Sequence, residues 1–133
     1  MGIFKLQKNS VGYDGEEIAV KFLEREGYEI IERNWCNAKG KRIGEIDIIA
    51  KDKNSELFIF VEVKTRNVDN FEEKVLPEEQ ITRSKLNKLN KIVEIYIKEN
   101  KLWNEKWRID AIAILIIANK SKIKVNHIKS IFL

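Results

Sequence analysis

Charged side chains alternate with apolar ones in two short runs that otherwise have the composition of buried β-strands. The runs cover residues 44–50 and 60–66 and are rich in Ile, Val and Phe. Successive side chains of a strand point to opposite faces, so Glu62 and Lys64 share one face of the second run, whose other face is entirely apolar. A purely structural strand would carry no charge at these positions. The two runs therefore bear on function as well as on fold.

The first run places Glu45 and Asp47 on one face, and the polar, turn-forming stretch 51–55 between the runs predicts an antiparallel hairpin. In the simplest register Asp47 lies opposite Phe60. Glu62 is then its diagonal neighbour on the same face, at roughly 7–8 Å between Cα atoms. Two carboxylates at this spacing can lean together and bind one divalent cation. The alternative is an ion-paired hairpin end that faces solvent.

An acidic residue followed fifteen positions later by Glu-x-Lys resembles the PD-(D/E)XK nuclease superfamily. The whole chain is similar to the YraN-like branch of that superfamily and, more distantly, to the archaeal Holliday junction resolvases. The matching pieces keep the family's order: they are Gly12-Tyr13-Asp14-Gly15-Glu16-Glu17, Gly27-Tyr28, Arg33-Asn34, Gly44-Glu45-Ile46-Asp47, Phe60-Val61-Glu62-Val63-Lys64-Thr65-Arg66, Thr82-Arg83-Ser84-Lys85 and Arg108-Ile109-Asp110. The proline that gives the superfamily its name is absent before Asp47.

The resemblance implies a DNA endonuclease that depends on Mg²⁺ or Mn²⁺ and acts on branched or other structured DNA. In the family's pattern, Asp47 and Glu62 hold the metal with the Val63 carbonyl, and Glu16 completes the site directly or through water. Lys64 then orients or deprotonates the attacking water. The resolvase-like relatives act as dimers, so the resemblance also implies a homodimer. The alternative is a non-catalytic nucleic-acid-binding module with the same fold.

Basic side chains near the expected site are candidates for contacts with DNA phosphates. They are Lys39, Lys41 and Arg42 in a basic loop, Arg66 after the second run, and Lys85 in the Thr-Arg-Ser-Lys piece. A net charge of +4 and a pI near 9.1 permit nucleic-acid binding without requiring it. The other interpretation of the loop is a solvated turn.

Length and composition restrict the class of protein. The chain of 133 residues suits one domain, residues 1–133, with a core of its own. The single cysteine, Cys36, excludes an internal disulfide and a Cys-rich zinc cluster, and suits the reducing cytoplasm. The longest apolar run, 111–118, is too short to span a bilayer, so no membrane partner is expected. The only histidine, His127, is expected at the surface or a strand end rather than as a metal ligand.

Periodicity and capping signals predict the remaining elements. A first helix begins after Ser10 or Asp14 and ends near Gly27, with Glu16 at the margin of its apolar stripe. A second helix is expected over 82–100, and further strands over 28–35, 107–117 and 122–128. The order αβββαββ predicts an α/β, restriction-endonuclease-like sandwich in which helices flank a mixed sheet. Arg108 and Asp110 share a strand face and are expected to form a structural ion pair.

Overall fold

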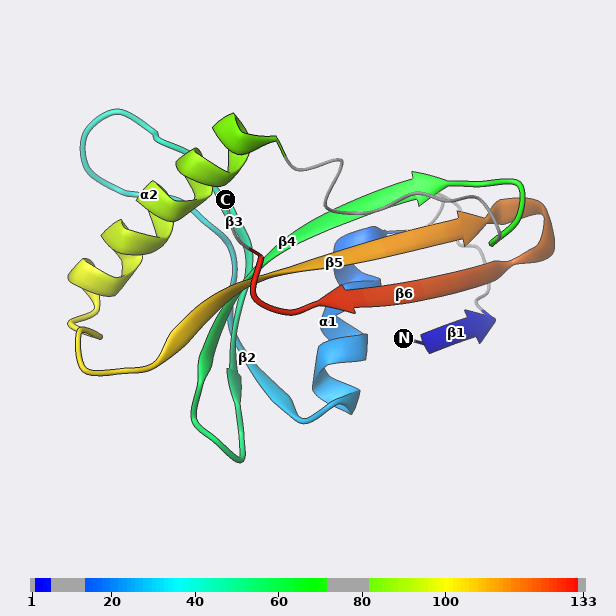
Figure 1. Cartoon of the computed structure of the whole chain (residues 1–133), viewed down its shortest axis with the longest axis horizontal. Coiled ribbons are helices and arrows are strands. Elements are labelled where there is room, and N and C mark those ends of the chain that lie inside the picture. The colour runs from blue at the N-terminus through cyan, green and yellow to red at the C-terminus, as the bar shows by residue number, and fades with distance from the viewer. Residues whose placement is uncertain (1, 6–13, 72–81, 132–133) are drawn as a thin grey trace.

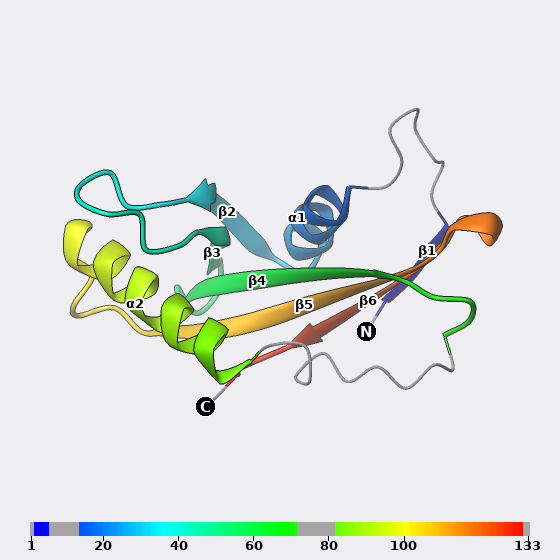
Figure 2. The same cartoon turned by 90° about the horizontal axis from the view of Figure 1, so that it is seen from above.

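The computed structural model describes residues 2–5, 14–71 and 82–131. Its elements are β1 (Gly2–Lys5), α1 (Gly15–Arg25), β2 (Tyr28–Trp35), β3 (Ile46–Asp52), β4 (Phe58–Asn67), α2 (Arg83–Glu99), β5 (Trp107–Ile117), a 3₁₀ turn (Ala118–Lys120) and β6 (Lys122–Ile128). One six-stranded sheet has the order β1-β6-β5-β4-β3-β2. The helices lie on opposite faces of it, α1 on one and α2 on the other (Figure 1; Figure 2).

The sheet is mixed, because β4 and β5 are parallel while the other neighbouring strands are antiparallel. This architecture confirms the α/β, restriction-endonuclease-like sandwich. The strands over 28–35, 107–117 and 122–128 begin and end at the residues expected. The expected order lacked β1, a four-residue strand that pairs with β6 at the sheet edge. A segment this short carries too little alternation to be recognised in sequence.

Each face of the sheet has its own apolar core. On the α1 face, Leu23 packs with Ile48, Val61 and Ile112, and all four side chains are inaccessible to solvent. On the α2 face, Phe60 packs against the helix and contacts Tyr96 with ring centroids 5.6 Å apart. The alternation expected in β4 is therefore confirmed, since its odd positions face α1 and its even positions face α2.

Both helices begin at residues that cap them. The Asp14 carboxylate accepts hydrogen bonds from the backbone N–H groups of Glu16 and Glu17, and the Thr82 hydroxyl accepts one from Lys85. The other suggested cap, Ser10, lies outside the described residues.

The N-terminus of α1 lies directly on the sheet. A Cβ atom placed on Gly15 would collide with the hydroxyl of Thr65 on β4, so only glycine allows this approach. The contact brings the first turn of α1, which carries Glu16, against the part of β4 that follows Glu62.

The expected register of the central hairpin was wrong by two residues. Ile49 lies opposite Phe60, and the last pair of β3 and β4 is Ile48 with Val61. The reason lies in the turn, where the Asp52 carboxylate accepts hydrogen bonds from the backbone of Asn54 and Ser55. A shift of two keeps every side chain on its face, because the period of a strand is two. The shared face of the carboxylates therefore survives the error.

Candidate functional site

The site forms where β3 and β4 separate. Beyond the pair of Ile48 and Val61, β4 continues beside β5 alone. The carboxylate of Asp47 occupies the gap, and its Oδ2 accepts a hydrogen bond of 2.8 Å from the backbone N–H of Val63. Burial raises the pKa of Asp47 to about 7; the Val63 N–H opposes this, and the charges of Glu62 and Glu16 add to it. Asp47 is thus a half-buried carboxylate that lies close to other carboxylates.

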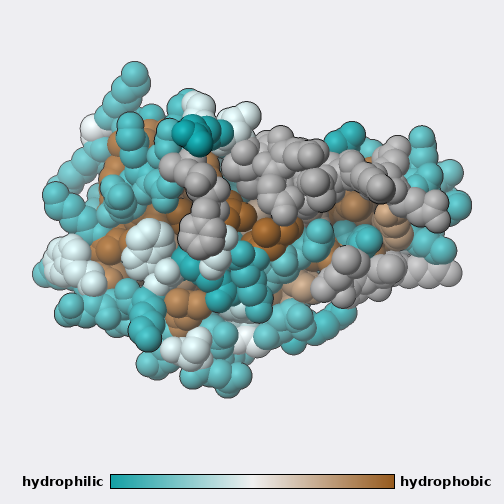
Figure 3. All heavy atoms as spheres, in the orientation of Figure 1, coloured by the Kyte–Doolittle hydropathy of each residue, from teal (hydrophilic) through white to brown (hydrophobic). Residues whose placement is uncertain are grey.

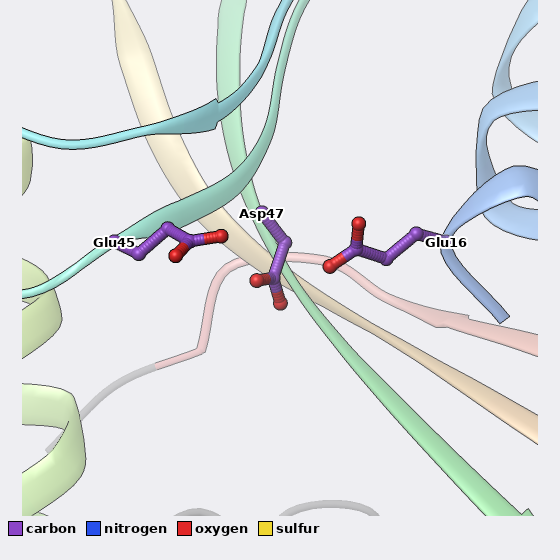
Figure 4. A group of neighbouring side chains, drawn as sticks. All are labelled: Glu16, Glu45 and Asp47. Atoms are coloured by element: carbon purple, nitrogen blue, oxygen red, sulfur yellow. The ribbon is translucent and has the colours of Figure 1, made fainter.

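Three carboxylates from separate parts of the chain converge at this point. Glu16 from α1, Glu45 from the segment before β3, and Asp47 each offer an oxygen, and these oxygens lie within 4.8 Å of one another (Figure 4). Each is partly accessible to solvent. A cluster of oxygen donors without sulfur or imidazole matches the ligands that Mg²⁺ and related hard cations prefer. The donor set therefore fits a divalent cation.

Glu45 was not expected as a ligand, although alternation had placed it on the same face as Asp47. Asn34 on β2 was also missed. With its amide oriented so that both polar atoms are satisfied, Asn34 Nδ2 lies 2.7 Å from Glu45 Oε1 and 3.0 Å from Glu16 Oε2. Its φ of 53° is left-handed, a conformation that asparagine tolerates better than most residues. Asn34 thus ties together two carboxylates that would otherwise repel.

Glu62 also interacts with Asp47, and two lysines approach it. Its side chain is 10% exposed, and its Oε1 lies 3.0 Å from Lys85 Nζ and 3.6 Å from Lys64 Nζ. Burial lowers the pKa of Lys64, and the nearby Lys85 lowers it further against the pull of Glu62. Hydrogen bonding to Lys64 and to Glu62 raises the pKa of Lys85, despite its partial burial. Lys85 therefore belongs to the centre of the site.

The basic loop before β3 is built around Asn37, which sequence reasoning did not select. Its buried amide donates to the carbonyls of Lys39 and Lys41 and accepts from the backbone N–H of Ile43. The side chains of Lys39 and Lys41 are exposed. Arg42 differs, because its guanidinium donates to Glu45 Oε2 at 2.8 Å. Arg66 is exposed on β4, two positions beyond Lys64.

A pocket of about 290 Å³ opens beside the carboxylates, between the basic loop, β3, β4 and α2. Glu45, Asp47 and Glu62 lie along its polar side with Lys85. The pocket leads from solvent directly to the acidic residues, so a ligand can reach them.

A second buried charge in the described ranges, Asp110 on β5, lies on the α1 face and is hydrogen-bonded within the core. It accepts hydrogen bonds from Arg108 Nε and His127 Nε2, each at 2.8 Å, and from the backbone of Ser130 at 2.9 Å. The expected Arg108–Asp110 pair is confirmed. His127 was expected at the surface or at a strand end, and it lies near the end of β6. Its side chain is only 7% exposed, because it packs against Tyr28 and bonds to Asp110.

Comparison with known proteins identifies the family of the chain. The model of "Uncharacterised protein family UPF0102" matches residues 15–114, which include every carboxylate and lysine of the site. The chain belongs to the UPF0102 (YraN) family. UPF0102 proteins of Caldanaerobacter subterraneus and Caldicellulosiruptor saccharolyticus are 40% and 37% identical, each over 96% of this chain and over 98% and 100% of their own length. The expected YraN-like identity is confirmed.

Among solved structures, Pyrococcus furiosus SfsA in complex with Ca²⁺ aligns with a TM-score of 0.35 and 13% identity. The alignment covers 89% of this chain and 62% of that chain. A likeness of this extent carries no weight for function. Within the described ranges, no helix is both long and apolar enough to cross a lipid bilayer.

Proposed function

We propose that this UPF0102 protein is a metal-dependent endonuclease that hydrolyses phosphodiester bonds in DNA. The observation that carries the proposal is the position of Asp47, whose pKa is raised to about 7 by burial between Glu62 and Glu16. Carboxylates in such a position repel one another unless a cation joins them. Together with two lysines, they supply the groups that phosphodiester hydrolysis requires.

Asp47 and Glu62 would hold Mg²⁺ or Mn²⁺, with the Val63 carbonyl and, directly or through water, Glu16. Glu45 joins this set because its carboxylate lies within reach of those of Glu16 and Asp47. A divalent cation there would polarise the phosphoryl oxygens and make a bound water more acidic. The Val63 N–H fixes one oxygen of Asp47, so the other can turn toward a ligand.

Lys64 is the residue that we assign to the chemical step. It follows Glu62 by two positions and shares its strand face, so its amine lies at the same edge of the site. Because its pKa is lowered by burial and by Lys85, Lys64 releases its proton more readily than an exposed lysine. It can then orient water or accept a proton from it at Nζ.

Basic side chains around the pocket would bind the phosphate backbone. Lys85 lies in the site itself, while Lys39, Lys41 and Arg66 are exposed and free to contact a phosphate backbone. Contacts of this kind carry no sequence information and position the strand for cutting. The alternative is a module that binds nucleic acid without cutting it. It is supported by the 3.0 Å ion pair of Lys85 with Glu62, because this pair balances the charge of Glu62 without a metal ion.

Cleavage assays decide between these functions. Purified protein would be incubated with single-stranded, duplex, flap and four-way-junction DNA in Mg²⁺, Mn²⁺ or EDTA. Wild type should cut at least one substrate with metal and none with EDTA. Lys64→Ala should still bind that DNA but cut it about 10²–10⁴-fold more slowly. Lys122→Ala, at an exposed position on β6, is the matched control and should cut at the wild-type rate. Equal residual cleavage by wild type and Lys64→Ala would favour the binding module.

The proposal extends to location and assembly. One cysteine, Cys36, suits a reducing compartment, so we propose a cytoplasmic protein. We also propose a homodimer, because the resolvase-like relatives act in pairs on branched DNA. Light scattering of the purified protein, with and without a four-way junction, measures the mass directly. A monomeric mass in both samples would exclude the dimer.

A further inference from the structure

Gly44 has no role in the structure that would require a glycine. Among the glycines within residues 14–71, Gly15 avoids a collision with Thr65, while Gly27 and Gly40 have φ values of 95° and 75°. Gly44 has no positive φ, and a Cβ atom built on it meets no atom within 4 Å. The protein itself could accept a side chain there. Glycine is also found where a ligand approaches the backbone closely, and Gly44 lines the pocket beside the carboxylates.

The pocket has one apolar wall and one polar wall. Ile43 on the loop, with Leu89 and Ile92 on α2, supplies the apolar wall, while the carboxylates and Lys88 also line the pocket. Ile43 is 38% exposed, so its side chain is open to a ligand in the pocket. In the space-filling view, apolar surface shows among hydrophilic side chains in the region where Figure 1 places the loop and α2 (Figure 3). The wall lies within reach of a molecule that also contacts the acidic residues.

The size and chemistry of the pocket suit one nucleotide. A volume of about 290 Å³ is at the lower limit for small-molecule pockets, which span roughly 300–1,000 Å³. A base could pack against the apolar wall while its phosphate lies near Lys85 and Lys88. A paired base cannot enter such a pocket, because its partner strand and stacked neighbours would have to enter with it. An unpaired base pays no such cost.

We propose that the pocket beside Gly44 binds an unpaired nucleotide next to the phosphate that is cut. The inference rests on the proposed endonuclease and names its substrate class, which is DNA with an unpaired nucleotide at the cut: single strands, flaps, gaps and junctions. Apolar packing against a base is tolerant of sequence, so the pocket selects structure rather than sequence.

The test uses Gly44→Leu, which fills the pocket, and Asn87→Leu, which adds the same side chain at an exposed position of α2 outside the pocket. The probe is a short single strand that contains 2-aminopurine, whose fluorescence rises when the base leaves a stack. Titrations in EDTA measure binding without cleavage. Wild type and Asn87→Leu should raise the fluorescence, whereas Gly44→Leu should bind about 10-fold more weakly with no rise. A blunt duplex that carries the same analogue should give no rise with any of the proteins.

A second variant guards against misfolding of the first. Ile43→Ser changes a side chain that is already partly exposed, so the fold should tolerate it, and it should weaken binding of the probe several-fold. Equal fluorescence changes in wild type, Gly44→Leu and Ile43→Ser would show that the pocket does not bind the nucleotide, even if metal-dependent cleavage is observed. Equal cleavage of blunt duplex and single strand by wild type would overturn it too. Loss of probe binding in both variants with no cleavage by wild type would keep the pocket and reject the endonuclease.

Discussion

The backbone N–H of Val63 donates a hydrogen bond of 2.8 Å to the carboxylate of Asp47 and so replaces a bond of the β-ladder. The two strands pair only as far as Ile48 and Val61, and the side chain of Asp47 fills the place that a carbonyl would occupy. The same bond satisfies a backbone donor that separation of the strands would leave without its ladder partner. The carboxylate of Asp47 is therefore both a structural hydrogen-bond acceptor and a candidate metal ligand.

Asp47→Asn should stabilise the protein in EDTA at alkaline pH. The folded pKa of Asp47, about 7, lies above the ordinary value of 3.8, so the folded state loses stability as pH rises between these values. Asparagine does not ionise, so the variant does not lose this stability. Its free energy of unfolding should exceed that of wild type by about 1–2 kcal/mol at pH 8, allowing for solvent screening, and by little near pH 4. Urea unfolding across this pH range measures the difference. Curves for wild type and variant that run parallel with pH would contradict the prediction.

The same variant should lose its response to metal. A cation that binds only the folded protein raises its melting temperature by mass action. Mn²⁺ should therefore raise the melting temperature of wild type more than that of Asp47→Asn. Equal responses would place the metal elsewhere.

Asn34→Asp should make the protein more dependent on metal. Aspartate has nearly the same shape as asparagine and also tolerates the left-handed backbone at this position. The change therefore only replaces an amide donor between Glu16 and Glu45 with a negative charge. Because Asn34 is exposed, we expect a loss of about 0.5–1.5 kcal/mol in EDTA, which Mn²⁺ reduces. Thermal melts with and without Mn²⁺ measure both effects. Asn104→Asp, exposed in the turn after α2, is the control. The same loss in both media would mean that Asn34 serves only the fold.

Lys39→Ala combined with Lys41→Ala should weaken binding to all DNA sequences alike. Each lost phosphate contact removes about 0.7–0.9 from the slope of log K against log salt, so the pair should reduce the slope by up to about 2. Arg42 is kept, because it binds Glu45. Lys120→Ala with Lys122→Ala, at the opposite end of the sheet, is the matched control (Figure 1). An unchanged slope in the loop variant would show that the loop faces away from DNA.

Asp110→Asn should destabilise the fold without altering the site. Burial tends to raise the pKa of Asp110, but hydrogen bonds from His127, Arg108 and the Ser130 backbone lower it below its ordinary value. Its stabilisation is therefore present above about pH 4 and lost at lower pH. Breaking this buried pair should cost about 3–5 kcal/mol at pH 7, and less at pH 3. Chemical denaturation measures it, with Asp69→Asn at an exposed position as control. A loss below 1 kcal/mol at pH 7 would contradict the structural role.

Apart from β1, the sequence alone determined the strands, the helices and the faces of the central hairpin. Alternation in β4 separates the side of Glu62 and Lys64 from the apolar side, and this holds whatever the register, because it depends only on neighbouring residues. Capping by Asp14 and Thr82 is equally local. These features are set by short stretches of chain and can be read from them.

Only the tertiary structure decided how these parts meet. The separation of β3 from β4, the closeness of Lys85 to Glu62 and the amide of Asn34 between Glu16 and Glu45 each join residues distant in sequence. The burial of His127 depends in the same way on packing between α1, β2 and β6. Distances of this kind follow from the packing of both helices on the sheet, and no local pattern of the chain encodes them.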